Sequence, residues 1–164
     1  MKVTLYYAPI ACSLVSLVSL NESGAEFEVK PVNMRKQEQL SPEYLKLNPK
    51  HKVPTLVIDG KPLTENVAMA LWMTRAFPKA GILPADPDTE IKAISLMAWC
   101  ASGIHPHLSR INSPLKFCDM PGSEEATKRL SAKELDAAFA IADDMLAGHE
   151  YFFDRWCAAD THFM

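Results

Sequence analysis

Apolar and polar positions in the first part of the chain follow two different periods. Residues 2–7 (KVTLYY) and 27–33 (FEVKPVN) are rich in β-branched and aromatic residues, which predicts two strands. Between them, apolar residues at 14, 15, 17, 18 and 20 have the i, i+3, i+4 spacing of a helix. We expect this helix to end by Gly24, so the segment predicts a β-α-β unit.

The next segment predicts a capped helix and then a hairpin. Residues 41–47 (SPEYLKL) are typical of a helix with Ser41 as its N-cap. Residues 52–65 (KVPTLVIDGKPLTE) predict two strands joined by a turn at Asp59-Gly60, and residues 65–77 predict a helix behind them. We therefore expect an α/β domain with a mixed four-stranded sheet covered by helices.

The second half of the chain changes to a purely helical pattern. Three prolines and a glycine between residues 78 and 88 indicate a linker. Residues 89–117 predict one long helix, bent near Pro106, and residues 123–148 predict a second one. We expect three parts: an α/β domain over 1–78, a linker over 79–88 and an all-α domain over 89–164.

The last segment, residues 150–164 (EYFFDRWCAADTHFM), predicts the start of another helix. Its apolar residues have no evident partner, because two amphipathic helices alone make a thin helical domain. We therefore expect the helical domain to be partial and the chain to be truncated.

Composition and charge exclude several classes of function. The chain is 48% hydrophobic and 23% charged, as is ordinary for a soluble globular protein. A net charge of −3 argues against nucleic acid and anionic membranes as partners. The apolar runs are shorter than the roughly 18 residues of a spanning helix. Because the N-terminal residues also fit a signal peptide poorly, we expect a cytoplasmic protein.

The four cysteines are scattered and form no CxxC pair, so the sequence does not favour a zinc knuckle or a dithiol motif. Cys12 stands at the predicted start of the first helix. Unpaired N–H groups and the helix dipole stabilise a thiolate there, and the thiolate is the reactive form. The alternative is a small apolar residue that packs under the helix.

Two further segments could bind a ligand. Pro54 opens a predicted strand and is a candidate cis proline, which would free the backbone of Val53 to pair with a peptide-like ligand; an ordinary trans edge proline is the alternative. Glu65 and Asn66 stand where a strand passes into a helix, so backbone amides there could hold a carboxylate and Glu65 an ammonium group. Lys36 could reach another carboxylate, or simply be solvated.

His105 and His107 form an HPH motif in the predicted long helix. Two histidines two positions apart on a helix point in different directions, and no third ligand is evident, so we expect no metal site. A single His105 that faces the Cys12 thiol across a cleft is a better hypothesis, since an imidazole can tune a thiolate or a polar substrate.

Taken together, these segments resemble the glutathione transferase family, whose N-terminal domain has a thioredoxin-like fold. The resemblance rests on YYAPIACSL, on LNPKHKVPTLVIDGKPLTEN, on the proline-rich linker and on the helical second part, and it spans essentially the whole chain. It is most similar to bacterial beta-class enzymes, whose YxPxxCS segment carries a cysteine at the position of Cys12.

The resemblance implies a role for each candidate residue. It implies a cis Pro54, with the Val53 backbone paired to the cysteinyl unit of glutathione, and it places Cys12 and Ser13 at the reacting sulfur. Glu65 and Asn66 would hold the γ-glutamyl end, Lys36 would lie near the glycyl carboxylate, and His105 would act across the cleft from Cys12.

Several residues depart from the family pattern. Asn66 replaces the usual serine or glycine, and Ile10 stands where a glycine is common two residues before the cysteine. Ala98 and Pro106 replace an asparagine and a lysine of the beta class. Cys157 begins the late capping box in place of serine or threonine and is a poor N-cap, although Asp160 keeps its place.

The resemblance implies a glutathione S-transferase that uses glutathione as co-substrate, attacks a small hydrophobic electrophile and forms a homodimer. Cys12 would either form a mixed disulfide with glutathione or, with Ser13, stabilise the glutathione thiolate. Two alternatives stay open: a non-catalytic or regulatory binding protein of the same fold, and a glutathione-dependent isomerase or dehalogenase.

Overall fold

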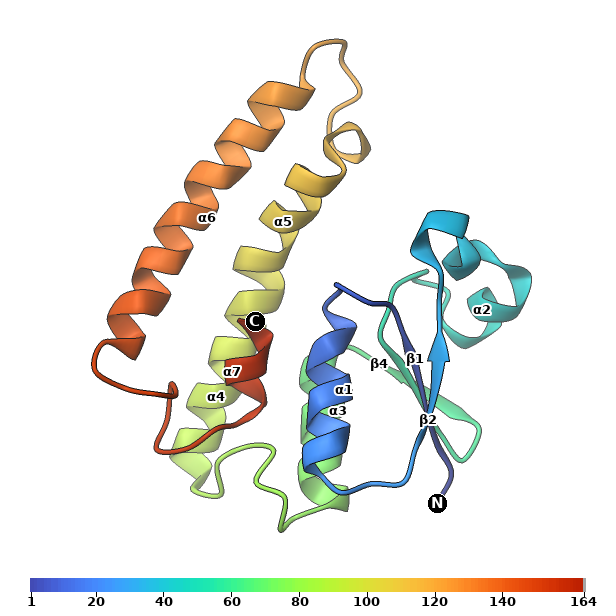
Figure 1. The fold of residues 1–164 in the computed structure, drawn as a ribbon, viewed down its shortest axis with the longest axis vertical. Coiled ribbons are helices and arrows are strands. Elements are labelled where there is room, and N and C mark those ends of the chain that lie inside the picture. The colour runs from blue at the N-terminus through green and yellow to red at the C-terminus, as the bar shows by residue number, and fades with distance from the viewer. Residues whose placement is uncertain (164) are drawn as a thin grey trace.

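Strand β1 forms the centre of the sheet, because it pairs on both sides. β1 (Val3–Tyr7) runs parallel to β2 (Glu28–Pro31) and antiparallel to β3 (Thr55–Ile58), and β3 continues through a hairpin into β4 (Lys61–Thr64). In this computed structural model, which describes residues 1–163, the strand order is β2-β1-β3-β4 (Figure 1). The prediction of a mixed four-stranded sheet is confirmed.

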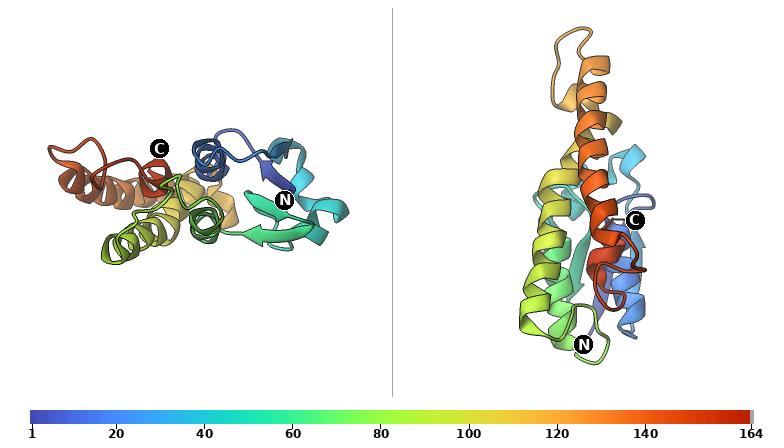
Figure 2. Two further views of the ribbon diagram at one scale, coloured as in Figure 1. Left: turned by 90° about the horizontal axis from the view of Figure 1, so that it is seen from below. Right: turned by 90° about the vertical axis from the view of Figure 1, so that its left-hand side faces the viewer.

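The two faces of the sheet carry different helices. Leu5 and Leu56 lie opposite each other in the register, are fully buried, and belong to the core that α1 (Ser13–Glu22) and α3 (Asn66–Ala76) complete. Figure 2 shows these two helices between the sheet and the helices of the second half. The helices of the second half therefore pack against α1 and α3 and not against the sheet itself.

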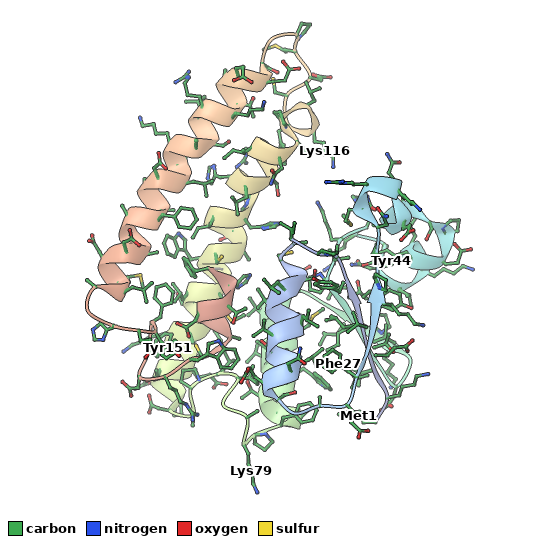
Figure 3. All side chains as sticks on the ribbon, in the orientation of Figure 1. Met1, Phe27, Tyr44, Lys79, Lys116 and Tyr151 are labelled. Atoms are coloured by element: carbon green, nitrogen blue, oxygen red, sulfur yellow. The ribbon has the colours of Figure 1, made fainter. Side chains whose placement is uncertain are left out.

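The opposite face of the sheet is covered by α2 (Pro42–Leu47). The Tyr6 ring of β1 meets the Tyr44 ring of α2 edge to face, with centroids 5.7 Å apart. Tyr44 is labelled in Figure 3. The Ser41 hydroxyl accepts the Tyr44 N–H at 3.2 Å, so the predicted N-cap is confirmed. Two 3₁₀ turns, η1 (Met34–Lys36) and η2 (Glu38–Leu40), connect β2 to this helix.

The predicted long helix of the second half is interrupted. α4 (Pro87–Trp99) passes into a π-helical turn, η3 (Cys100–Ile104), and then into α5 (His105–Asn112). Pro106 is the physical reason, because it has no N–H for the preceding turn and its ring crowds the carbonyl four residues earlier. The turn is wider than an α-helical one and ends where His105 begins the next helix.

A 3₁₀ turn, η4 (Pro114–Lys116), and the long helix α6 (Glu124–Leu146) follow, and α7 (Ala158–His162) is the last helix. Met164, the end of the predicted helical domain, lies outside the described residues. Within residues 1–163, the helices are all too short or too polar to cross a membrane.

The last helix does have a packing partner, so the expectation of an unpartnered segment is wrong. α7 lies against α1 and α4 (Figure 1), and its first two residues, Ala158 and Ala159, are fully buried. The Ala158 N–H donates to the carbonyl of Ile82 in the linker at 2.8 Å. Small side chains permit this close approach, and hydrophobic periodicity alone did not reveal it.

Asp160 holds the segment that leads into α7. Its carboxylate accepts the Cys157 N–H at 2.7 Å and the Phe152 N–H at 2.9 Å. The carboxylate half of the capping box is therefore present despite Cys157, and it also ties down the irregular segment before the helix.

We predict that Asn48→Ala destabilises the fold by about 1–3 kcal/mol. Asn48 is almost fully buried, and its amide donates to the Lys52 carbonyl at 2.8 Å and to Thr55 Oγ1 at 3.0 Å. Its Oδ1 accepts the Lys50 N–H at 3.1 Å, so the loop before β3 would lose three bonds. Urea unfolding measures the loss. The matched control, Asn21→Ala on the exposed side of α1, should change the stability little; equal effects of both variants would contradict the prediction.

Candidate active site

One cavity of about 370 Å³ lies where the sheet domain meets the helices of the second half. The sheet domain contributes four segments to its lining: the loop before α1, the loop between α2 and β3, the end of β4 and the start of α3. The helical half contributes residues of η3, α5 and α7, and the residue that follows η4. The lining residues are Cys12, Asn48, Lys52, Val53, Pro54, Thr64, Glu65, Asn66, Val67, Ala101, His105, Pro106, Ser109, Phe117 and His162. Six of the eight residues that the sequence identified, or that the resemblance implied, are brought together here.

Cys12 precedes α1 and is half-buried, with its thiol inside the cavity. The thiol donates a hydrogen bond to the Val53 carbonyl, with Sγ and O 3.3 Å apart. Burial is the largest effect and raises the pKa of the Cys12 thiol. A backbone hydrogen bond lowers the pKa by less, and the nearby Glu65 carboxylate raises it by less still. The net direction is opposite to the lowered pKa that a stabilised thiolate needs, so a reactive Cys12 thiolate stays a prediction.

Ser13 lies outside the cavity and is completely buried. Its hydroxyl accepts the Ala8 N–H at 3.1 Å and donates to the Ala8 carbonyl at 2.9 Å, which closes the loop before α1. The catalytic role implied for Ser13 does not fit this position, because its hydroxyl is engaged inside the loop. Ile10, at the tip of that loop, has φ of 54°, the left-handed conformation that glycine adopts most easily.

Asn66 connects the two helices that begin at the cavity. Its Oδ1 accepts the Ser16 hydroxyl at 2.7 Å, and its Nδ2 donates to the Cys12 carbonyl at 2.9 Å. The side-chain amide is therefore engaged within the protein. The groups of α3 that can bind a ligand at this position are its first backbone N–H groups, because they have no partner inside the helix.

Glu65 is the N-cap of α3 and lines the cavity with φ of 75°, an unusual conformation for a non-glycine residue. Its Oε1 accepts the Lys50 ammonium at 2.5 Å, and the same ammonium donates to Thr64 Oγ1 at 2.8 Å. The sequence predicted a carboxylate that takes an ammonium group, and in the free protein that group belongs to Lys50.

Val53 and Pro54 are joined by a cis peptide bond, as the family resemblance implied, and both line the cavity. Lys36 lies on η1, is exposed and does not line the cavity, so its contact with a ligand stays a prediction. Lys52 lines the cavity instead. Sequence reasoning missed it, although its place directly before Val53 was a usable signal.

Two histidines face the cavity from the helical half. His105 begins α5, and burial lowers its pKa, with a smaller contribution from the charge of Lys52. His162, at the end of α7, has its pKa lowered to about 4, chiefly by burial and then by the charge of His105. Both imidazoles are therefore neutral at pH 7. The sequence missed His162 because α7 had no predicted packing partner.

The HPH motif is divided by the fold, because His105 lines the cavity and His107 does not. Among residues 1–163, there is no group of three His, Cys, Asp or Glu side chains that could hold a metal ion.

We predict that His162 makes stability depend on pH. The unfolded chain, with a pKa of 6.5 at this group, binds the proton more readily than the folded chain, with a pKa of about 4. Stability is therefore complete above pH 6.5 and falls as the pH drops toward 4, by about 2 kcal/mol at pH 5. Urea unfolding of wild type and His162→Gln at pH 7 and pH 5 should show a smaller pH effect in the variant.

The matched control for this prediction is His149→Gln, because His149 is exposed in the segment after α6. It should keep the pH dependence of the wild type. An undiminished dependence in His162→Gln would contradict the assignment of this effect to His162.

Comparison with known proteins gives matches of three kinds. Residues 1–72 match the family described as glutathione S-transferase, N-terminal domain. A zeta-class glutathione S-transferase of Euphorbia esula is 32% identical over 90% of this chain and 65% of its own length. Glutathione S-transferase GstA of Escherichia coli O157:H7 is 33% identical over 76% of this chain and 62% of its own length. The alignments thus cover just under two thirds of these two relatives.

Among solved structures, a glutathione transferase homolog from Sulfitobacter with bound glutathione has a TM-score of 0.91. It is 26% identical, and the match covers 99% of this chain and 79% of that one. The family match therefore covers the sheet domain, and the structural neighbour shares the fold of the sheet domain and of the helices that follow it.

Proposed function

We propose that the cavity binds glutathione and that the protein is a beta-class-like transferase with Cys12 at the reacting sulfur. The observation that carries this proposal is the arrangement around the thiol. A carboxylate and a helix start lie at one end of the cavity, the Val53 backbone lies beside Cys12, and Lys52 also lines the wall. The Sulfitobacter relative, whose structure contains glutathione, supports the choice of ligand.

The charged ends of glutathione match these groups. Glu65 takes the ammonium of the γ-glutamyl unit, and the first N–H groups of α3 at Asn66 take its carboxylate. The Val53 backbone pairs with the cysteinyl unit, as an extended peptide pairs with a strand edge. In this proposal Lys52, which lines the cavity, takes the glycyl carboxylate, and Lys36 is a second candidate for that end.

The state of the Cys12 thiol favours one of the two mechanisms. Because burial raises its pKa, Cys12 carries its proton at neutral pH and donates it to the Val53 carbonyl. The same S–H can donate to the glutathione sulfur and stabilise it as a thiolate, while a mixed disulfide would require Cys12 itself as the anion. Neutral His105 faces the cavity and can accept the proton that glutathione loses.

The second substrate is an electrophile held against the helical wall. In the transfer step the glutathione thiolate attacks the electrophilic carbon, a C–S bond forms, and the leaving group departs with its bonding electrons. The helical half lines the cavity with the apolar side chains of Ala101, Pro106 and Phe117 beside the polar ones of Ser109 and His162, and the apolar part suits a small hydrophobic substrate. A homodimer stays a prediction from the family resemblance, and a cytoplasmic location stays a prediction from the N-terminal sequence.

We predict that Glu65→Gln weakens glutathione binding about tenfold, because the ligand ammonium loses a charge-assisted hydrogen bond. Isothermal titration calorimetry with reduced glutathione measures the change. Glu43→Gln, on the exposed side of α2 and outside the cavity, is the matched control and should bind as the wild type does. Equal affinity of the wild type and Glu65→Gln would contradict this placement of the ligand.

We predict that Cys12→Ser keeps most of the conjugation rate and that Cys12→Ala loses about tenfold or more, since a hydroxyl can donate where a methyl group cannot. The rate is measured with a small aromatic electrophile. If both variants lose activity equally, and oxidised glutathione forms an adduct confined to Cys12, the mixed-disulfide mechanism is correct instead. Binding without turnover by the wild type would favour the non-catalytic alternative.

The adduct is detected by mass spectrometry in a Cys118→Ser background. Cys118 is only partly buried, and hydrogen bonds, first from the Ser123 side chain, lower the pKa of its thiol. It would therefore react with oxidised glutathione for reasons unrelated to the cavity.

A further inference from the structure

We propose that Lys50 competes with the ligand for the Glu65 carboxylate and thereby sets the affinity for ligands with a free amino group. This inference rests on the proposed function, in which Glu65 takes the γ-glutamyl ammonium. The family resemblance implied no role for Lys50, and its own side chain does not line the cavity.

The competing contact is direct. The Lys50 ammonium lies 2.5 Å from Glu65 Oε1 and donates to Thr64 Oγ1 at 2.8 Å. Glu65 and Thr64 both line the cavity, so Lys50 reaches from outside to the rim that they form. It presents to Glu65 the same chemical group that the γ-glutamyl end of the ligand would bring.

The chain holds both partners in place by their backbones. The Lys50 N–H donates to Asn48 Oδ1 at 3.1 Å, and the amide of Asn48 is fixed by the Lys52 carbonyl and Thr55. On the other side, Glu65 directly precedes Asn66, whose side chain is bonded to α1 at both of its ends. The backbones of Lys50 and Glu65 are already fixed before their ion pair forms. The ion pair therefore costs only the conformational entropy of the two side chains.

Electrostatics gives the direction of the effect. The Lys50 charge offsets the Glu65 charge, and a second ammonium on the same carboxylate would be repelled by the first. More than half of each side chain is exposed to solvent, so screening keeps this effect small. We therefore expect Lys50 to modulate binding and not to prevent it. A ligand without a positive charge at this end should not respond to Lys50.

The test is calorimetric titration of Lys50→Gln with reduced glutathione and with N-acetylated glutathione at low salt. We expect glutathione to bind the variant about two- to fivefold more tightly than the wild type, and the acetylated ligand to bind both alike. In a Glu65→Gln background, Lys50→Gln should produce no gain, because the carboxylate for which Lys50 competes is absent. Lys61→Gln, an exposed charge removal on β4, is the matched control and should change neither affinity.

The outcomes separate the two proposals. If the wild type binds glutathione and Lys50→Gln binds it equally or more weakly, competition by Lys50 is wrong, and weaker binding would identify Lys50 as a direct ligand contact. If neither protein binds glutathione, the proposed function is wrong and this inference falls with it.

Discussion

The bridge that Asn66 makes between α1 and α3 is the contact on which the site depends. Its side chain accepts the Ser16 hydroxyl and donates to the Cys12 carbonyl, and the residue is almost completely buried. Loss of either bond would leave a buried polar group without a partner, which is costly. The bridge therefore fixes the distance between the N-termini of α1 and α3. Cys12 is the N-cap of α1, and Glu65 is the N-cap of α3.

Burial determines the charges inside the cavity. Desolvation raises the pKa of Cys12 and lowers the pKa values of His105 and His162, so all three groups are neutral at pH 7. The charged residues among the lining are Lys52 and Glu65. A neutral interior beside charged groups suits a ligand that carries its thiol in the middle and its charges at the ends.

Local sequence rules predicted most of the sheet domain because its elements are encoded by neighbouring residues. The Ser41 cap, the Asp59-Gly60 turn and the strand periodicity each depend on a few adjacent positions, and each was found as expected. The π-helical turn was missed because a proline predicts an interruption but not its form. The role of Ser13 came from the family resemblance and not from a local rule, and the geometry of the loop directs its hydroxyl to Ala8.

The sequence by itself determined the element order and named the candidates Cys12, Val53, Glu65, Asn66 and His105, since motif and spacing carry that information. The cis bond before Pro54 followed only from the family resemblance, because the residues alone left the trans form open. The tertiary structure decided what surrounds them. It alone brought His162 and Lys52 to the cavity, paired Glu65 with Lys50 and left Lys36 outside. The physical reason is that burial and ion pairing depend on segments far apart in the chain, and the docking of α7 against α1 and α4 has no local signal.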